Sequence, residues 1–246
     1  MIQVNEWEID INHFPDGTLR LSLPEKFSKY GDGEFACLNW YYENEEETLA
    51  IIYVPRQLQE NGYSVGLNMP YIPNARQDRV INPTDVFTLK YFSEIINSLG
   101  FEFVKVMDAH SNVSLALLDR VQEAKPGKQI MDTIGVISDL EHCTLNDILL
   151  FFPDEGAMKR YSESFRGWDY AFGIKRRNKQ TGQIEGLDVQ GDVEAIKDKV
   201  VLIIDDICSK GGTFYHSSKK LKELGAGKIY LYITHCENTV LKGEMI

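Results

Sequence analysis

Short apolar runs alternate with longer amphipathic segments along most of the chain. Runs rich in β-branched and aromatic residues predict buried strands at residues 35–42, 103–107, 133–138, 148–152, 170–174, 200–204 and 229–234. Helical spacing of apolar residues predicts helices over 84–99, which begins with a threonine cap and stops at Gly100, and over 213–224, which stops at Gly225. Strands that alternate with helices of this length predict an α/β fold whose mainly parallel sheets are built from βαβ units.

Two segments carry less regular patterns. Residues 45–61 contain a β-like run at 49–54, yet their length and the stop at Gly62 favour a helix, which Pro55 would kink. Helix and strand both stay open for this segment. Residues 176–192 are polar, contain glycine and show no apolar period, which predicts a long mobile loop. A division near residues 129–133 predicts two α/β domains, 1–130 and 131–246.

Composition narrows the class of protein. The chain has 246 residues, of which 43% are hydrophobic and 26% charged, as in globular proteins. No run approaches 18 apolar residues, and the acidic N-terminus lacks the order of a signal peptide, so we expect no membrane association and a cytoplasmic location. For a phage-encoded chain that would be the host cytoplasm. The four cysteines form no Cys-x-x-Cys pair and are expected to be reduced thiols.

The charge pattern favours a small anionic substrate. The net charge of −11 argues against a nucleic-acid-binding surface, which needs a basic face. Basic residues nevertheless gather at 175–177 and at 219–220. A local cationic patch on an acidic protein suits a small polyanion better than a polymer.

The clearest chemistry lies in VVLIIDDICSKGGTF, residues 200–214. A buried strand ends in two carboxylates, Asp205 and Asp206, and a loop with Gly211 and Gly212 leads into a helix. Ligands of open α/β sheets bind at the carboxyl ends of strands. Glycines let backbone N–H groups approach a phosphate, and the helix N-terminus adds partial positive charge. The pattern resembles the phosphoribosyl-diphosphate motif of type I phosphoribosyltransferases and of ribose-phosphate pyrophosphokinases.

Two further segments distinguish these families. MPYIPNARQDR, residues 69–79, resembles a signature of the pyrophosphokinases that simple phosphoribosyltransferases lack. The resemblance implies that Arg76, Gln77 and Asp78 bind ATP. VMDAHS, residues 106–111, resembles the family's Val-Asp-x-His segment, whose histidine, here His110, helps to hold the Mg²⁺ that accompanies ATP. A structural histidine stays open as the alternative, because magnesium prefers oxygen ligands.

Two segments in the second half extend the resemblance. FPDEG, residues 152–156, resembles the family's Ser-Pro-Asp-x-Gly, which implies that Asp154 is a second metal ligand. The three basic residues at 175–177 match the opening of the family's catalytic loop, which implies that Lys175 and Arg177 are catalytic. They would close over the site and stabilise charge on the transferring group. Solvated basic residues in a linker are the competing interpretation.

A segment near the N-terminus points to an oligomer. FPDGT, residues 14–18, is similar to the family's adenine-binding Phe-x-Asp-Gly-Glu segment, with Thr18 in place of the glutamate. In the family this segment serves the ATP site of a neighbouring subunit. The resemblance therefore implies that Phe14 and Asp16 bind ATP and that the protein is a homo-oligomer, a dimer or a hexamer.

The phosphate loop departs from the family pattern. Ser209 and Lys210 stand where family members usually have an acid and a threonine. The chain also ends at Ile246, where family members continue with a further βα portion. The altered loop resembles a divergent, phage-like branch that uses ADP-ribose. The position of the chain end leaves open either a truncated chain or a short branch of the family. The residues expected to bind the ribose phosphate are Asp205, Asp206, Cys208, Ser209, Lys210, Gly211, Gly212 and Thr213.

The resemblance implies an enzyme with two phosphoribosyltransferase-like domains, the first binding ATP. It would transfer the diphosphate of Mg-ATP to the C1 hydroxyl of a 5-phosphorylated ribose and release AMP. The acceptor stays open between ribose 5-phosphate and ADP-ribose. A type I phosphoribosyltransferase and a non-catalytic regulatory subunit stay open as alternatives, although the presence of His110, Asp154, Lys175 and Arg177 argues against the second.

Overall fold

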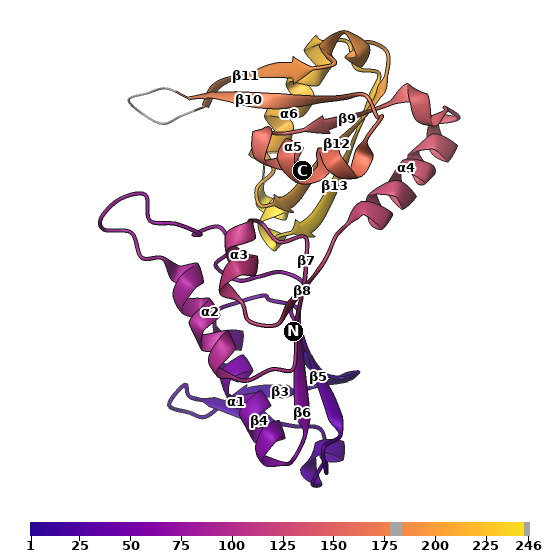
Figure 1. The fold of residues 1–246 in the computed structure, drawn as a ribbon. Helices are drawn as coiled ribbons and strands as arrows, with labels where there is room; N and C mark the ends of the chain where they lie inside the picture. The colour runs from indigo at the N-terminus through magenta and orange to yellow at the C-terminus, as the bar shows by residue number, and fades with distance from the viewer. Residues whose placement is uncertain (178–183, 244–246) are drawn as a thin grey trace. The chain divides into compact units, whose positions relative to one another are not determined.

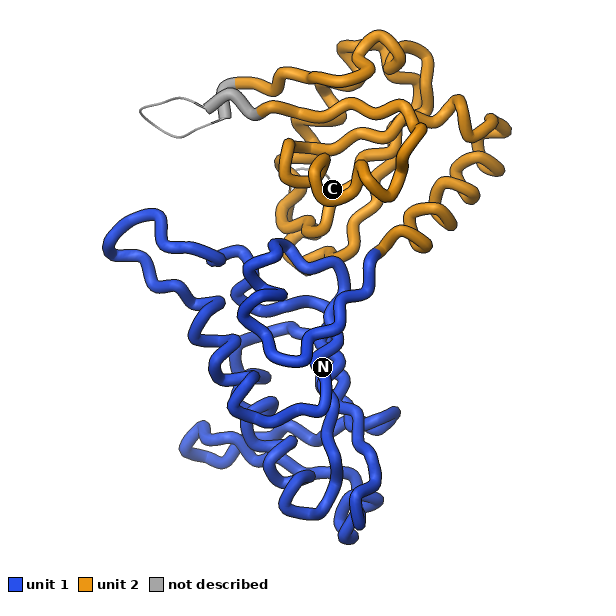
Figure 2. Tube along the Cα trace, viewed as in Figure 1, with its two compact units in different colours: residues 1–125 blue, residues 126–246 orange. Residues whose placement is uncertain are grey.

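The computed structural model describes residues 1–177 and 184–243, with the side chains of 175–177 and 184–185 excepted. It consists of two compact units, Met1–Lys125 and Pro126–Ile246 (Figure 2). The division expected between residues 130 and 131 falls inside helix α4 (Gly127–Glu141), which begins directly after Pro126. Each unit holds a mainly parallel sheet with helices beside it, and this confirms the predicted α/β class (Figure 1).

The first unit is built on a six-stranded sheet in the order β2-β1-β5-β6-β7-β8. Strands β5 to β8 run parallel, whereas β1 pairs antiparallel with both β5 and β2. The strands are β1 (Ile2–Val4), β2 (Trp7–Glu8), β5 (Phe35–Trp40), β6 (Ser64–Asn68), β7 (Val104–Met107) and β8 (Val121–Ala124). A separate antiparallel hairpin joins β3 (Asp10–His13) to β4 (Leu19–Ser22).

Helices connect the parallel strands of this unit. They are α1 (Glu46–Glu60), α2 (Thr88–Ser98) and α3 (Asn112–Leu117), with a short 3₁₀ turn, η1 (Glu25–Ser28), before β5. The open segment 45–61 is thus a helix: Ala50, Val54 and Leu58 recur at helical spacing on its buried face, and Pro55 is accommodated within it. Helix α2 begins later than the expected residue 84, because a turn in which Asp85 accepts the N–H groups of residues 81 and 82 precedes it.

The second unit is built on a five-stranded sheet in the order β11-β10-β9-β12-β13. All neighbours are parallel except β10 and β11. The strands are β9 (Ile148–Phe152), β10 (Tyr170–Arg177), β11 (Ile184–Gly191), β12 (Val200–Cys208) and β13 (Lys228–Cys236). Helix α4 precedes β9, α5 (Glu155–Tyr161) follows it, and α6 (Gly212–Glu223) joins β12 to β13. Short 3₁₀ turns, η2 (Leu145–Asp147), η3 (Ser162–Phe165), η4 (Val193–Ile196) and η5 (Asn238–Lys242), fill connections.

The central strands of this sheet are buried on both faces. Alternate residues of β9 join different clusters: Leu150 packs with Ile134 of α4, and Phe151 packs with Leu221 of α6. Every residue of β9 is therefore buried, which explains its continuous apolar run. The central strands were predictable from sequence for this reason.

Two sequence predictions for this unit were wrong. The expected strand at 133–138 is part of α4, where Ile130, Ile134 and Ile137 lie at helical spacing against the core. Much of the expected loop at 176–192 is strand, because β11 pairs antiparallel with β10 and turns Leu187 and Val189 toward the core. Residues 178–183 of that expected loop lie outside the described part of the chain.

The structure adds two observations on membrane and thiol chemistry. In the described ranges, no helix combines the length and apolarity that a bilayer crossing requires. The four cysteines are free thiols, but Cys208 and Cys236 lie opposite each other on neighbouring strands. The parallel pairing of β12 with β13 brings these two thiols close together.

Candidate active site

The strand order of the second unit reverses beside β9. The chain runs from β9 to β10 on one side, and later returns to place β12 on the other side. Such a switch point opens a crevice at the carboxyl ends of the two strands, where α/β proteins bind ligands. Strand β9 ends just before Asp154, and β12 continues past Ile203, the partner of Phe151, into Asp205 and Asp206. The fold thus gathers three predicted site carboxylates at one edge of the sheet.

Asp206 is held by a residue that the sequence did not single out. A guanidinium nitrogen (Nη1) of Arg160, in the last turn of α5, lies 2.8 Å from Oδ1 of Asp206. Only 17% of the Arg160 side chain and 5% of the Asp206 side chain are exposed. Burial is the largest influence on the pKa of the Arg160 guanidinium and lowers it, but the charge of Asp206 and contacts with Asp206 and Tyr161 together raise that pKa above its usual value. The Arg160–Asp206 ion pair is therefore enclosed at the sheet edge.

Asp205 has a different environment. Burial raises the pKa of its carboxyl well above the usual range, and the negative charges of Asp206 and Asp154 raise it further. Its Oδ1 accepts the N–H of Asp206 at 3.0 Å. Asp154 caps α5, with its Oδ1 accepting the N–H of Ala157 at 3.1 Å. The carboxyl groups at this sheet edge thus lie in different environments, and their oxygens can accept hydrogen bonds from sugar hydroxyls.

The predicted phosphate loop lies between β12 and α6. Gly211 caps α6 with φ 79°, a conformation that favours glycine, and its carbonyl accepts the N–H groups of Phe214 and Tyr215. Lys210 is exposed, and Gly212 and Thr213 are partly exposed in the first turn of the helix. Cys208 is buried at the end of β12. This strand–loop–helix geometry is the one that binds phosphate through backbone N–H groups.

A contact beyond the motif anchors this loop. Ser209 Oγ donates to Glu237 Oε2 at 2.6 Å, and the N–H of Glu237 donates to the carbonyl of Cys208 at 2.8 Å. Thr239 Oγ1 also donates to Glu237 Oε2, at 3.2 Å. The backbone of Gly243 packs closely on that of Lys210. A Cβ added to Gly243 would lie 2.0 Å from the carbonyl oxygen of Lys210. The segment after β13 therefore shapes the loop.

The predicted ATP residues lie in the first unit, on the connection from β6 to α2. Arg76 and Gln77 are exposed, and Gln77 Oε1 accepts the hydroxyl of Thr88 at 2.8 Å. Asp78 is 8% exposed, and its Oδ1 accepts Nε of Arg79 at 2.9 Å. An exposed arginine and amide beside a buried, paired carboxylate can present charge and hydrogen bonds to a nucleotide.

His110 follows the carboxyl end of β7 and is half-buried. The neighbouring Ala109 donates its N–H to Glu123 Oε1 at 3.0 Å, and Lys125 pairs with the same carboxylate at 2.6 Å. Within the described ranges, the structure holds no cluster of three or more metal-ligating side chains. A dedicated metal cage is therefore not a feature of the described residues.

Phe14 and Asp16 form the tip of the β3–β4 hairpin. The N–H of Phe14 donates to Thr18, and Asp16 Oδ1 accepts both the N–H and the hydroxyl of Thr18 at 3.0 and 2.7 Å. The backbone hydrogen bond from Thr18 is the main cause that lowers the pKa of Asp16. Phe14 is 49% exposed, so an aromatic ring and a carboxylate project together from the tip.

The predicted catalytic pair lies on β10. The backbone of Lys175 pairs with Leu187 of β11, and that of Arg177 with Ile184. Strand β10 itself is the neighbour of β9. The side chains of Lys175 and Arg177 lie outside the described part, so their role stays a prediction.

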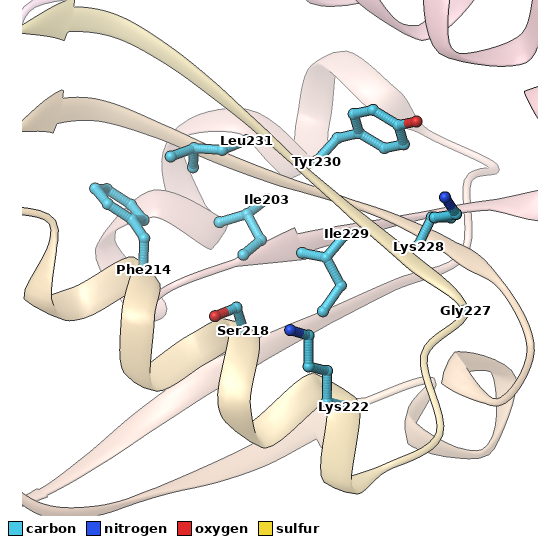
Figure 3. A pocket seen from close by; sticks show the side chains of 9 residues that line it. All are labelled: Ile203, Phe214, Ser218, Lys222, Gly227, Lys228, Ile229, Tyr230 and Leu231. Atoms are coloured by element: carbon cyan, nitrogen blue, oxygen red, sulfur yellow. The ribbon is translucent and has the colours of Figure 1, made fainter. Parts of the chain in front are cut away.

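A hollow on the second unit lies away from these residues. It follows the edge strand β13 from Lys228 to Leu231 and is bordered by Phe214, Ser218 and Lys222 of α6 (Figure 3). Lys228 begins β13, so the hollow extends to the amino end of the strand. The candidate site lies at the carboxyl ends instead.

Comparison with known proteins decides the family. The chain is 31% identical over 237 residues to a ribose-phosphate pyrophosphokinase of Thermococcus kodakarensis, covering 93% of this chain and 77% of the relative. The chain belongs to the ribose-phosphate pyrophosphokinase family. The enzyme of that name from Pyrococcus furiosus is 29% identical, with 92% and 77% covered. A scan against models of protein families finds no match.

The fold agrees with the family. Phosphoribosylpyrophosphate synthetase from Mycobacterium smegmatis superposes with a TM-score of 0.74 over 93% of this chain and 72% of that chain, at 21% identity. At this identity the match shows the fold. Membership in the ribose-phosphate pyrophosphokinase family makes the chain a diphosphotransferase-type enzyme.

Two residues of the site were missed from sequence. Arg160 pairs with a carboxylate on a different strand, and Glu237 meets Ser209 from the end of the next strand. The members of each pair are far apart in the sequence and meet only when the βαβ units fold, so a local motif could not reveal either contact. The one clue in the sequence was that Arg160 lies on the helical segment that directly follows the predicted site residue Asp154.

Proposed function

We propose that this chain transfers the β,γ-diphosphate of Mg-ATP to the C1 hydroxyl of a ribose that carries a phosphate on C5. The hydroxyl oxygen attacks the β-phosphorus, the bond to the oxygen bridging the α- and β-phosphates breaks, AMP leaves with that oxygen, and the hydroxyl proton is released. The observation that carries this proposal is the meeting of Asp154, Asp205 and Asp206 at the carboxyl ends of β9 and β12, beside the loop that leads into α6. Family membership supplies the reaction class.

The acceptor sugar would bind in this crevice. Asp205 and Asp206 would accept hydrogen bonds from the ribose hydroxyls, and the N–H groups of residues 209–213 would hold the phosphate on C5. Catalysis of phosphoryl transfer depends mainly on such positioning and on charge stabilisation. The crevice thereby aligns C1 for attack.

ATP would use residues of the first unit. Arg76 and Gln77 are exposed on one connection and can contact phosphates and base, with Asp78 supporting the loop through Arg79. Lys175 and Arg177 of β10 would stabilise charge on the diphosphate as it moves. Phe14 and Asp16 would complete the ATP site of a neighbouring subunit in a homo-oligomer.

The magnesium would arrive as part of the Mg-ATP substrate. Magnesium in such sites is bound by one or two carboxylates together with substrate phosphates. Asp154 offers a hard oxygen ligand, and the lack of a larger ligand cluster among the described residues fits this mode. His110 would contribute directly or through water. Bound magnesium neutralises charge on the triphosphate.

Two acceptors fit the proposed chemistry, ribose 5-phosphate and ADP-ribose. The altered loop supports the second, because Ser209 and Lys210 stand where family members usually have an acid and a threonine that bind a terminal phosphate. A phosphodiester lacks the terminal dianion that the usual loop binds. Both acceptors remain part of the proposal.

The test is incubation with Mg-ATP and each sugar, followed by mass spectrometry of the products. We expect AMP and a sugar that has gained a diphosphate. Asp205→Asn should lower the rate strongly, whereas Asp139→Asn, on the exposed face of α4, should retain it. Stoichiometric ADP with a monophosphorylated sugar would contradict the proposal.

A further inference from the structure

Helix α5 links two parts of the proposed site. Its first residue follows Asp154, whose carboxylate caps the helix through Ala157, and its last turn carries Arg160, which lies 2.8 Å from Asp206. One short helix thus connects a proposed magnesium ligand with a proposed ribose ligand. We propose that Arg160 is a positioning residue for the acceptor sugar, a role that rests on the proposed function.

Burial is the first argument for this role. The Arg160–Asp206 pair is almost fully enclosed, with 17% and 5% of the side chains exposed. An exposed ion pair contributes little, whereas a buried charge that loses its partner is left uncompensated. Arg160 therefore offsets the buried charge of Asp206 and holds its carboxylate in place inside the sheet edge.

Packing is the second argument. The guanidinium carbon of Arg160 lies 5.7 Å from the ring centre of Tyr161, and that ring stacks on Phe152 of β9 at 6.2 Å. Both aromatic residues belong to one core cluster. The position of Arg160 is thus set by the packed core, and an arginine held in this way can fix the geometry of a carboxylate.

Charge balance is the third argument. Asp154, Asp205 and Asp206 lie together at the carboxyl ends of β9 and β12, so three acids share the proposed sugar site. A phosphorylated sugar that approaches uncompensated acids is repelled. Arg160 offsets the charge of Asp206, and this reduces the repulsion between the acids and an anionic sugar.

The neighbouring residue provides a matched control. Lys159 lies on the same helix and pairs with Glu155 at the surface, with 69% and 63% of the side chains exposed. Lys159→Gln removes one positive charge from α5 without touching Asp206. Any effect of net charge alone would appear in both variants.

The experiment compares wild type, Arg160→Gln, Arg160→Lys and Lys159→Gln in the full chain. Calorimetry measures binding of ribose 5-phosphate, ADP-ribose and α,β-methylene-ATP, each with Mg²⁺. We expect Arg160→Gln to weaken binding of the preferred sugar at least about tenfold and that of the ATP analogue less than about twofold. Arg160→Lys should restore part of the sugar affinity, and Lys159→Gln should match wild type.

The outcomes separate this role from the proposed function. Wild-type protein that binds neither sugar would contradict the proposed function and, with it, the role of Arg160. Normal sugar binding by a folded Arg160→Gln protein, or equal loss of sugar and nucleotide, would overturn the role of Arg160 alone. If circular dichroism shows that Arg160→Gln does not fold, Arg160→Lys decides: selective loss of sugar affinity supports the role, and unchanged affinity contradicts it.

Discussion

The hydroxyl of Ser209 donates a 2.6 Å hydrogen bond to the carboxylate of Glu237. This bond ties the phosphate loop after β12 to the segment after β13. The two strands are parallel neighbours, and the N–H of Glu237 continues their ladder to the carbonyl of Cys208. The loop is therefore fastened at its start by both a side-chain and a backbone contact.

Ser209→Ala should loosen the phosphate loop and weaken binding of the acceptor sugar. A hydrogen bond to a charged group contributes roughly 1.5–3 kcal/mol, and partial exposure places this one near the lower end. We expect the KM for the sugar to rise about tenfold and the KM for ATP to stay within about twofold. Thr239→Ala, which removes the longer bond to the same oxygen, should have a smaller effect. Equal effects of the two variants would show that the Ser209 hydrogen bond contributes no more to sugar binding than the Thr239 hydrogen bond.

Lys210 should influence the choice of sugar. With ADP-ribose, a second phosphate extends past the loop, where the exposed Lys210 could pair with it. Such a contact is worth roughly 1.5–3 kcal/mol, or about 10- to 150-fold in specificity. Lys210→Thr should shift the ratio of kcat/KM values toward ribose 5-phosphate by that order. An unchanged ratio would mean that Lys210 is a solvated residue at the loop rim.

Lys175→Ala and Arg177→Ala should lower kcat by at least about 100-fold. Contacts made mainly in the transition state appear in kcat, and the loss of one costs about 2.7–4 kcal/mol in comparable sites. Steady-state kinetics with Mg-ATP at saturating sugar measures the effect, and titration of α,β-methylene-ATP tests whether affinity is kept. If only KM changes, the two residues bind ATP and do not act in transfer.

Phe14→Ala should reduce activity through a neighbouring subunit. The ring is 49% exposed at a hairpin tip, where a neighbour can cover it. We expect the variant to raise the KM for ATP in the oligomer. Mixing it with Arg76→Ala protein should restore some ATP sites. In a mixed oligomer, one subunit supplies an intact Arg76 and its neighbour supplies an intact Phe14. Light scattering that finds a fully active monomer would contradict the shared site.

Cys208 should be unreactive near neutral pH. Burial, followed by the charge of Cys236, raises the pKa of the Cys208 thiol to about 11, against 9.0 for an unperturbed thiol. The folded state holds this proton more tightly, so the resulting stabilisation is present below pH 9 and is lost as pH rises toward 11. Timed alkylation with mass spectrometry should label the exposed Cys236 first. Rapid labelling of Cys208 at pH 8 would show that the thiol is not enclosed.

Sequence predicted the central strands because burial on both faces makes them continuous apolar runs, as in β9. It missed β11, where Leu187 and Val189 alternate with polar residues and only one face is buried. Motif resemblance assigned Asp154 to the metal and Asp205 and Asp206 to the ribose, and these roles stay predictions. It could not supply Arg160, because its contact with Asp206 depends on how α5 packs against β12.

The position of β9 between β10 and β12 has a consequence for biosynthesis. Strand β9 can pair with β10 early, but its other edge stays open until β12 has been translated. Pairings between distant segments form slowly, and open strand edges invite aggregation. The proposed sugar site, at the carboxyl ends of β9 and β12, can therefore assemble only after β12 has been translated. A chaperone that shields the free edge of β9 would act at that stage.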